Sequence, residues 1–257
     1  YMKMPADRVL EFGAPQFEVY RDPISEDDDA LRAMFRVPAS VPVLLYAGVS
    51  KSVDETAHLE ALDAAIASGA MPPCHVVYRP HPWRGGLVPG ERNFFDVPFR
   101  HVSMDPFMAD YYRRVAGTPE QGFDMADYRV TARLLRLVSG IISPLSTMLL
   151  EAAMHGLPMI MFWPDGPKGA AGYTIELGRR LPHFAEFWGP EGIQICTERD
   201  GLAEACRRLL TEHQAPAVRD ALREHARGYV SSDGPRYDQK LADLADELAR
   251  SHAVRAA

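Results

Sequence analysis

Cysteine is scarce in this sequence, and the few cysteines present do not have the pattern of a disulfide framework or of a zinc site. The chain has 257 residues and only three cysteines, Cys74, Cys196 and Cys206. Their number is odd, and their spacing is not that of paired metal ligands. We therefore interpret them as small buried side chains of a protein in a reducing, cytoplasmic compartment.

Long apolar runs and clusters of positive charge are also missing. No apolar stretch approaches the roughly 20 residues of a membrane-spanning helix, and we find no signal peptide. The net charge is −7 and no run of Lys and Arg interrupts the acidic balance, which argues against nucleic acid as a partner. With 47% hydrophobic and 25% charged residues, the composition is that of a domain able to bury its own core.

The sequence lacks the signatures of several well-known active sites. There is no GxxxxGK[ST] phosphate loop and no GxGxxG dinucleotide fingerprint. A GxSxG nucleophile elbow, an HExxH motif and clusters of metal-ligating residues are missing as well. We therefore expect neither a nucleophile-based hydrolase nor a metal or other cofactor.

What the sequence does contain is a regular alternation of short apolar runs and stretches with helical spacing. The expected strands cover residues 8–13, 43–48, 75–78, 99–103, 140–143, 158–163 and 192–196. The expected helices cover residues 26–36 (with Ser25 as N-cap), 54–68, 128–138, 146–155, 199–211, 217–227 and 236–252. This alternation predicts an α/β fold, a Rossmann-like parallel sheet flanked by helices, in one domain over residues 1–257.

Three segments rich in Gly, Pro and aromatic residues interrupt this alternation: 84–98, 104–125 and 164–180. We expect them to be loops. In an open parallel sheet the ligand crevice lies outside the carboxyl ends of the strands. The loops are therefore expected near that crevice.

The first candidate site is the segment "VVYRPHPWRGG", where a strand runs into Arg79 and then into a histidine between two prolines. The prolines restrict the backbone around His81. A guanidinium and a directional imidazole N–H both suit a phosphate oxygen. Arg79, His81 and Pro82 are therefore candidate nucleotide-binding residues, although the prolines could equally serve only to end the strand.

The second candidate site is "IISPLSTMLLEA", where a buried strand leads into a helix. A helix N-terminus presents free N–H groups and the positive end of the helix dipole, which together attract anions. Ser143, Ser146 and Thr147 would add hydroxyl donors. Glu151, one turn further, could accept a ribose hydroxyl or pair with a neighbour. Simple N-capping by Ser or Thr explains the pattern equally well.

The third candidate site is "YAGVSKS", where Gly48, Ser50 and Lys51 follow a strand in a short flexible loop. A small loop with a lysine resembles a turn that contacts phosphate. A solvated loop without a ligand is the simpler interpretation, because no known phosphate-loop spacing is present.

Together these segments resemble a known family. "YRPHP" after a strand, followed about fifty residues later by "DYRVTARLLRLVSGIISPLSTMLLEAAMHGLPMIMF", resembles the C-terminal, donor-binding half of bacterial GT-B-fold glycosyltransferases. The pattern is most similar to enzymes with cytidine-activated donors: sialyltransferases, Kdo transferases and CDP-glycerol glycerophosphotransferases. "RVLEFGAPQFEVY" resembles the start of this lobe after the interdomain linker, within residues 1–20. "SSDGPRYDQKLADLADEL" resembles the closing segment, with a C-terminal helix in 235–257.

The resemblance implies the donor lobe of a metal-independent transferase that builds capsule or other surface polysaccharide, or lipopolysaccharide. In that family the His-Pro motif and the downstream Ser–Ser/Thr motif contact the nucleotide phosphate; the matching residues here are His81-Pro82 and Ser146-Thr147. His81 would stabilise the leaving phosphate, and no catalytic base can be named. The partners implied are a CMP- or CDP-linked donor and a glycan or glycolipid acceptor, the latter reached through another lobe or a partner chain. Peripheral association with a membrane is compatible with this role.

Other functions remain open at this point. Besides a CDP-glycerol-type transferase, non-hydrolysing UDP-sugar 2-epimerases share the architecture. They usually carry a Gly-rich Ser-Asp-Ser-Gly-Gly-type segment where this chain has "SPLSTMLLEA". A lone lobe could also be a nucleotide-binding subunit of a split transferase that performs no chemistry itself.

Overall fold

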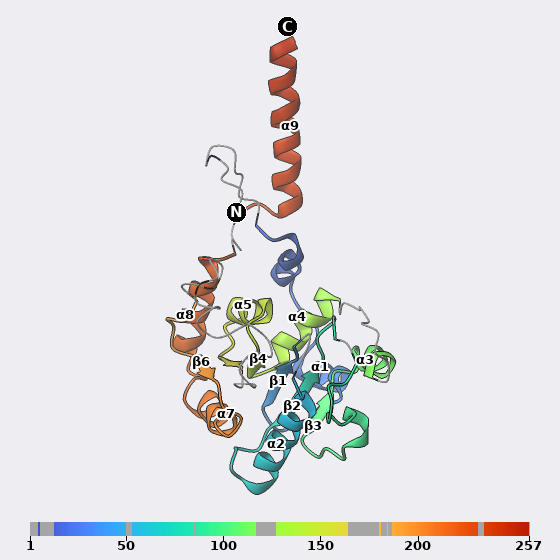
Figure 1. The fold of residues 1–257 in the computed structure, drawn as a ribbon. Coiled ribbons are helices and arrows are strands. Elements are labelled where there is room, and N and C mark those ends of the chain that lie inside the picture. The colour runs from blue at the N-terminus through green and yellow to red at the C-terminus, as the bar shows by residue number, and fades with distance from the viewer. Residues whose placement is uncertain are drawn as a thin grey trace.

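The computed structural model describes residues 13–49, 53–84, 86–116, 127–163, 187–230 and 234–256, together with Pro5, Arg180 and Phe184. Six strands within these residues form one parallel sheet in the order β3-β2-β1-β4-β5-β6 (Figure 1). The strands are β1 (Val43–Ala47), β2 (His75–Arg79), β3 (Val102–Met104), β4 (Gly140–Ser143), β5 (Met159–Phe162) and β6 (Ile193–Cys196). The predicted α/β, Rossmann-like fold class is confirmed.

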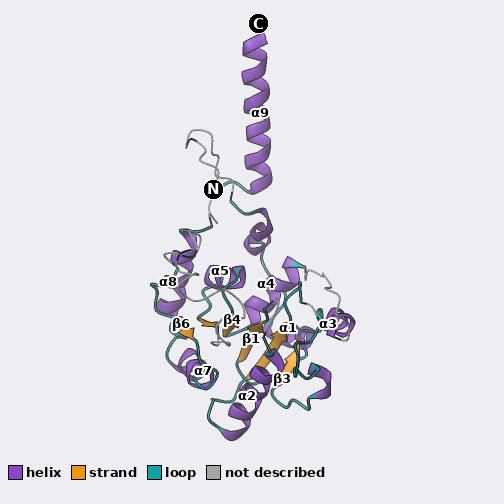
Figure 2. Cartoon of the chain, viewed as in Figure 1, coloured by secondary structure: helices purple, strands orange, loops and turns teal. Residues whose placement is uncertain are grey.

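Helices flank this sheet (Figure 2). The α-helices are α1 (Asp28–Phe35), α2 (Glu55–Ser68), α3 (Ala109–Ala116), α4 (Tyr128–Leu137), α5 (Thr147–Met154), α7 (Leu202–Thr211), α8 (Pro216–Arg227) and α9 (Tyr237–Ala256). Two short 3-10 helices are η2 (Pro15–Arg21) and η3 (Phe94–Asp96).

The sheet is buried on both faces, and alternate strand residues enter two separate apolar cores. In β1, Leu44 and Tyr46 pack with residues of α2 and α7, whereas Val43, Leu45 and Ala47 pack with residues of α1, α4, α5 and α8. Successive side chains of a strand point to opposite faces, so a strand between two helical layers must be apolar throughout. This explains the continuous run of hydrophobic residues in β1.

The strand order reverses between β1 and β4. From β1 the chain builds outward through β2 to β3, and it then returns to place β4 on the other side of β1, where Leu45 pairs with Ile141. In a parallel sheet such a reversal leaves a crevice at the carboxyl ends of the two strands. The fold therefore predicts a ligand site beyond Ala47 and Ser143.

Several sequence-based boundaries were wrong. Helix α1 begins at Asp28, and its N-cap is Asp27 rather than Ser25: the Asp27 carboxylate accepts a hydrogen bond from the Ala30 amide at 2.8 Å. Strand β3, at Val102–Met104, begins three residues after the expected start at residue 99 and ends one residue after the expected end at residue 103. The expected loop 104–125 contains helix α3, whose Tyr111 and Tyr112 are buried.

Some predictions fall outside the described residues. Of the strand expected at 8–13 only Gly13 is described, and of the loop expected at 164–180 only Arg180 is described. The helix expected at 236–252 is present as α9.

Helix α9 projects away from the rest of the chain (Figure 1). Its side chains Leu241 and Leu248 are 50% and 60% exposed. Just before the helix, Arg236 contacts the N-terminal segment through Asp22 at 2.6 Å and through the carbonyl oxygen of Glu18 at 3.0 Å. Across the part of the chain that the structure describes, no helix combines the length and apolar character needed to cross a membrane.

Candidate functional site

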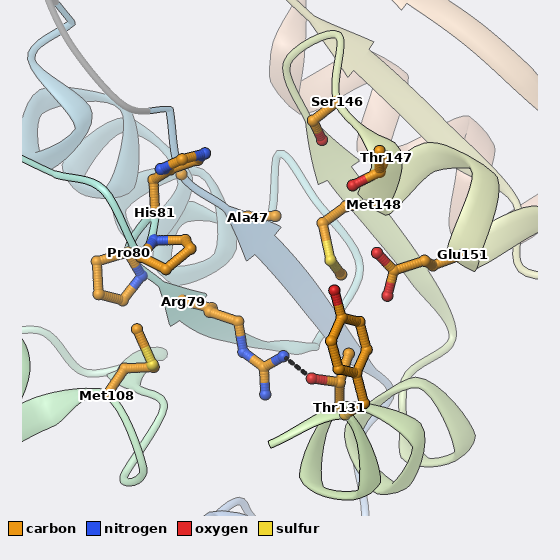
Figure 3. Close-up of a pocket in the computed structure, with 13 residues that line it drawn as sticks. Ala47, Arg79, Pro80, His81, Met108, Thr131, Ser146, Thr147, Met148 and Glu151 are labelled. Atoms are coloured by element: carbon orange, nitrogen blue, oxygen red, sulfur yellow. Dashed lines mark hydrogen bonds between the residues drawn. The ribbon is translucent and has the colours of Figure 1, made fainter. Parts of the chain in front are cut away.

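A cavity of about 210 Å³ lies at the carboxyl edge of the sheet, where the strand order reverses. His81 lies on one side of it, and Ser146, Thr147 and Glu151 lie on the other (Figure 3). The residues that line it come from the ends of β1 and β2 and the turns after them, from the residue just before α3, from α4, and from α5 with its N-cap: Ala47, Gly48, Arg79, Pro80, His81, Pro82, Met108, Tyr128, Thr131, Ser146, Thr147, Met148 and Glu151. All three segments that the sequence singled out thus meet in one place, the third through Ala47 and Gly48.

A tight turn after β2 holds His81. The Arg84 amide donates to the carbonyl oxygen of His81 at 3.0 Å, and Pro82 supplies the fixed φ that the second position of such a turn favours. The Trp83 amide donates to Nδ1 of His81 at 3.0 Å. Since Nδ1 accepts this bond, the ring proton lies on Nε2, and burial lowers the pKa of the imidazole. His81 is therefore a neutral side chain with one N–H left to donate.

Arg79, the last residue of β2, is held by two buried partners. Its Nε donates to Oδ2 of Asp105 at 2.6 Å, and its Nη1 donates to the Thr131 hydroxyl at 2.9 Å. Its Nη2 is buried and has no partner within the described residues. Arg79 is thus a fixed positive charge in the cavity wall whose guanidinium is already oriented by the protein.

The N-terminus of α5 faces the cavity without the usual side-chain cap. Ser146 is the N-cap residue, yet its hydroxyl makes no capping bond and instead lies 2.9 Å from the Ser143 hydroxyl. Ser143 itself is buried and does not line the cavity. Simple N-capping, the alternative interpretation from sequence, is therefore not what the Ser146 side chain does. Ser146 and Thr147 present hydroxyls at the positive end of the helix.

Glu151 is a buried carboxylate in the cavity wall. It accepts a hydrogen bond from the Tyr20 hydroxyl, and Thr147 one turn earlier in α5 provides another. Burial raises the pKa of Glu151, while these hydrogen bonds and the nearby Arg79 charge oppose the rise. The side chain pairs with neighbours, as one of the two sequence interpretations had it, and it also borders the cavity. The contact with a ribose hydroxyl stays a prediction.

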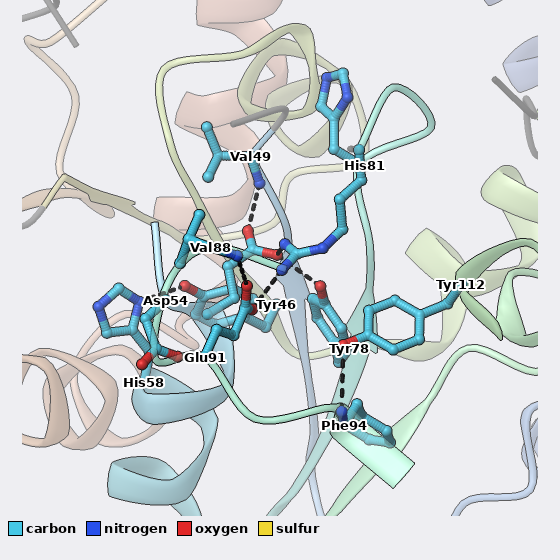
Figure 4. Close-up of polar contacts among 12 residues, drawn as sticks. Tyr46, Val49, Asp54, His58, Tyr78, His81, Val88, Glu91, Phe94 and Tyr112 are labelled. Atoms are coloured by element: carbon cyan, nitrogen blue, oxygen red, sulfur yellow. Dashed lines mark hydrogen bonds and ion pairs between the residues drawn. The ribbon is translucent and has the colours of Figure 1, made fainter. Parts of the chain in front are cut away.

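Behind the loops lies a buried ionic cluster, which we call the Glu55–Arg84–Glu91 triad (Figure 4). The Arg84 guanidinium binds the Glu55 carboxylate through Nη1 and the Glu91 carboxylate through Nη2. Glu55 also accepts bonds from the Tyr78 hydroxyl at 2.6 Å and from the Val49 amide. One carboxylate thus ties the loop after β1 to the loop that carries His81.

Gly48 lines the cavity, and the structure gives it a further role. A Cβ at this position would lie 2.8 Å from both carboxylate oxygens of Glu55. The missing side chain therefore lets the triad approach the end of β1. Ser50 and Lys51, the other candidates in this loop, lie outside the described residues.

Sequence reasoning missed several residues of the site, among them Asp105, Thr131, Tyr128 and Tyr20. Asp105 directly follows β3, so it lies at the same sheet edge as Arg79. An acidic residue directly after a strand is a pattern from which the sequence could have predicted its place in the site. Thr131 and Tyr128 lie on α4, which was correctly expected as a helix, but the apolar spacing that predicts a helix does not show what its polar side chains contact. The described residues contain no group of three or more His, Cys, Asp or Glu side chains placed to hold a metal ion.

The fold is similar to that of several solved structures. The wall teichoic acid polymerase TagF matches with a TM-score of 0.55 and 17% identity over 97% of this chain and 54% of its own. A TagF variant soaked with CDPG matches with a TM-score of 0.53 and 16% identity, again over 97% of this chain and 54% of its own. The UDP-GlcNAc 2-epimerase of Neisseria meningitidis bound to UDP-GlcNAc matches with a TM-score of 0.52 and 14% identity, over 95% of this chain and 57% of its own.

These similarities show the fold, which is that of one lobe of the GT-B architecture. The chain spans only a little more than half the length of those proteins. No protein-family model matches it, and no curated protein matches it by sequence.

Proposed function

We propose that this chain is the donor-binding lobe of a metal-independent glycosyltransferase and that its cavity binds the nucleotide of an activated sugar. The observation that carries the proposal is the convergence of His81 and the α5 N-terminus on one cavity at the reversal of strand order. Two fixed sets of donors then face each other across a space that can receive a phosphate group. The GT-B-like fold supports this assignment.

The chemistry of such a site is stabilisation of a leaving group. When the bond between sugar and phosphate breaks, negative charge grows on the phosphate oxygens. The Nε2–H of His81 would donate from one side, and Ser146, Thr147 and the helix dipole would act from the other. The fixed charge of Arg79 in the wall would add to the positive potential. Donors that are already oriented need no reorganisation during the reaction.

A cytidine nucleotide, CMP or CDP, is the donor type that we favour. The His-Pro and Ser-Thr motifs resemble those of cytidine-dependent families, and the fold matches TagF, including a variant soaked with CDPG. Glu151 is placed to accept hydrogen bonds from the ribose hydroxyls while the phosphate lies at the start of α5. The pathway we propose is synthesis of capsule, lipopolysaccharide or another surface polysaccharide, on the cytoplasmic side.

The acceptor would be bound by another lobe or chain. The matched structures are nearly twice as long as this chain, and a transfer reaction needs a site for the second substrate. Helix α9, with Leu241 and Leu248 exposed on a projecting arm, offers an apolar surface for such a partner. The residue that activates the acceptor would belong to that other part.

A second candidate is an enzyme like the UDP-sugar 2-epimerases, which the match to the Neisseria meningitidis enzyme supports. It would take a UDP-sugar and need no acceptor. Two further alternatives would use the same cavity. A CDP-glycerol-type transferase would transfer a different group, and a non-catalytic subunit of a split transferase would bind the nucleotide without catalysing a reaction. Base selectivity separates the epimerase-like alternative from the cytidine-dependent ones.

Isothermal titration calorimetry with CMP, CDP, UDP and GDP tests the proposal. We expect a cytidine nucleotide to bind most tightly. We expect His81→Ala to weaken its binding by roughly 10- to 100-fold, the value of a hydrogen bond to a charged group, about 1.5–3 kcal/mol. The control is His101→Ala, which removes an imidazole that does not line the cavity. Unchanged affinity for CMP and CDP in a folded His81→Ala variant would sink the assignment, and a preference for UDP would favour the epimerase-like alternative.

A further inference from the structure

Tyr20 reaches the candidate site from a distant part of the sequence. It lies in η2, 131 positions before Glu151 in the chain, and its hydroxyl donates a hydrogen bond to Oε2 of the Glu151 carboxylate. Tyr20 does not line the cavity, whereas Glu151 does. The tyrosine therefore holds the carboxylate from behind and leaves the cavity side open.

The position of Tyr20 is itself fixed by packing. Its ring stacks on that of Phe17, which is buried, with centroids 5.8 Å apart, and meets the ring of His155 edge-on at 4.8 Å. At the other side of η2, Arg236 contacts Asp22 and Glu18. Because these ring contacts and the contacts of Arg236 together hold η2, the Tyr20 hydroxyl is presented to Glu151 in one orientation.

Glu151 has spare acceptor capacity in this arrangement. A carboxylate offers about four acceptor positions, and the bonds from Tyr20 and Thr147 use two of them. Figure 3 shows the Glu151 side chain extending from α5 toward the cavity, next to Thr147 and Met148. The remaining positions can receive hydroxyl groups of a bound ligand.

Without Tyr20 the carboxylate would have other attractive neighbours. The charge of Arg79 acts on Glu151, and the buried Nη2 of that guanidinium has no partner within the described residues. A rotation of Glu151 toward Arg79 would pair the two groups. It would also turn the acceptor positions of the carboxylate away from a ligand.

We propose that Tyr20 is a positioning residue that orients Glu151 to accept the ribose hydroxyls of the nucleotide, so that discrimination between ribose and deoxyribose depends on a residue outside the cavity. The inference rests on the proposed function, because it assumes a nucleotide in the cavity. It adds a specificity determinant from η2, a segment that the sequence matched to the start of the lobe but not to the site.

The test compares CDP with 2′,3′-dideoxy-CDP by calorimetry in wild type, Tyr20→Phe and Glu151→Gln. We expect the wild type to bind CDP about tenfold more tightly than the dideoxy analogue, the value of one or two hydrogen bonds. Tyr20→Phe should bring that ratio close to one while the affinity for the dideoxy analogue stays within about twofold. Glu151→Gln should lower the ratio in the same way. A purely structural role of Tyr20 would instead weaken both nucleotides equally.

The matched control is Tyr229→Phe, which removes a tyrosine hydroxyl next to Phe187 and His225, outside the cavity lining. The ratio of its affinities for CDP and for the dideoxy analogue should equal that of the wild type. Arg236→Gln loosens η2 without touching Tyr20 and should lower the ratio partly, which keeps the proposal testable if Tyr20→Phe folds poorly.

The outcomes separate the two proposals. If Tyr20→Phe and Arg236→Gln both keep the wild-type ratio of CDP to dideoxy-CDP affinity, the role of Tyr20 is overturned and the proposed function stays intact. Tighter CDP binding in Tyr20→Phe has the same meaning. A wild type that binds both nucleotides equally overturns the ribose contact of Glu151, and with it the positioning role. A wild type that binds no nucleotide overturns the proposed function itself.

Discussion

The backbone amide of Trp83 donates a hydrogen bond to Nδ1 of His81 over 3.0 Å. An imidazole nitrogen that accepts a bond carries no proton, so the other nitrogen, Nε2, must be protonated in the neutral ring. Burial lowers the pKa of His81 below its ordinary value of 6.5. We therefore predict that His81 is a neutral Nε2–H tautomer at pH 7.

Nitrogen-15 NMR of the labelled protein measures this directly, because protonated and unprotonated ring nitrogens have well-separated shifts. We expect one His81 signal of each kind at pH 7. A protonated Nδ1, whether as the other tautomer or as an imidazolium, would contradict the hydrogen bond and would remove the neutral donor from the proposed site.

For His81, the sequence alone predicted the position of the residue but not its tautomer. The flanking prolines and the end of an apolar strand correctly placed His81 in a turn at the carboxyl edge of the sheet, because strand ends and proline turns are local features. The tautomer depends on the amide two residues away in a folded turn, which no residue pattern encodes. In the same way, Arg79 was visible as a charge at a strand end. That Asp105 and Thr131 hold it follows from the packing of β3 and α4 beside β2.

Tyr20 and the Glu55–Arg84–Glu91 triad were out of reach for a related reason. Their partners are separated by 131 positions for Tyr20 and Glu151 and by 29 for Glu55 and Arg84. Hydrophobic periodicity predicts which face of a helix is buried, but it does not predict that a glutamate at a helix start will be buried as well. The least predictable part of the site is therefore the set of polar residues that are buried, because a polar side chain is normally expected at the surface.

The triad should contribute strongly to stability. Arg84 and Glu55 are both buried, and removing one partner leaves a charge without compensation in the interior. We predict that Arg84→Gln lowers the free energy of unfolding by about 3–5 kcal/mol, as measured by urea denaturation. Since the Arg84 side chain also ties the loop that carries His81 to Glu55, and through it to the loop after β1, nucleotide affinity should fall in the same variant.

The matched control for the triad is the ion pair between Glu60 and Arg92, which joins the same two segments at the surface. Exposed pairs contribute about 0–1 kcal/mol, so Arg92→Gln should have little effect on unfolding. An equal decrease in the free energy of unfolding in Arg84→Gln and Arg92→Gln would show that the buried triad stabilises the loops no more than a surface ion pair does.

Gly48 should not tolerate a side chain, because the space beside it is filled by Glu55. The Cβ of an alanine would lie 2.8 Å from the Glu55 carboxylate oxygens, closer than such atoms normally approach. We predict that Gly48→Ala costs about 1–3 kcal/mol, typical of overpacking. Gly189→Ala is the control, since a Cβ there would meet no atom within 4 Å. A thermal midpoint in Gly48→Ala equal to that of Gly189→Ala would disprove the steric argument.

The Thr131 hydroxyl should matter through Arg79. It accepts the Nη1 bond of Arg79 at 2.9 Å and lies in the wall of the cavity. Thr131→Val keeps the shape of the side chain but leaves a second guanidinium nitrogen of Arg79 unpaired, at a cost of about 1–3 kcal/mol in urea unfolding. Thr211→Val, at an exposed helix end, should cost less than about 0.5 kcal/mol. A loss in Thr131→Val no larger than in Thr211→Val would mean that Arg79 finds another partner.

Two buried histidines should make the fold sensitive to acid. Burial lowers the pKa of His58 and of His75 from 6.5 to about 4. His58 contacts the Tyr46 hydroxyl at 2.9 Å, and His75 contacts the Ser103 hydroxyl at 2.8 Å. Between pH 6.5 and 4 these two histidines bind protons in the unfolded chain but not in the folded chain. The free energy of unfolding therefore decreases as the pH is lowered. Above pH 6.5 the two histidines contribute no pH dependence.

Urea unfolding at a series of pH values from 7.5 to 4.5 checks this window. The wild type should lose stability progressively below pH 6.5, and the variant with both His58→Gln and His75→Gln should show a shallower slope over the same range, even if it is less stable at pH 7. The raised pKa of Glu55 and of Glu151 acts in the opposite direction, since the folded form of each then binds its proton more tightly than the unfolded form. Because those carboxyl groups are present in both proteins, the difference between the two slopes isolates the histidines. Parallel slopes would assign the acid sensitivity to other groups.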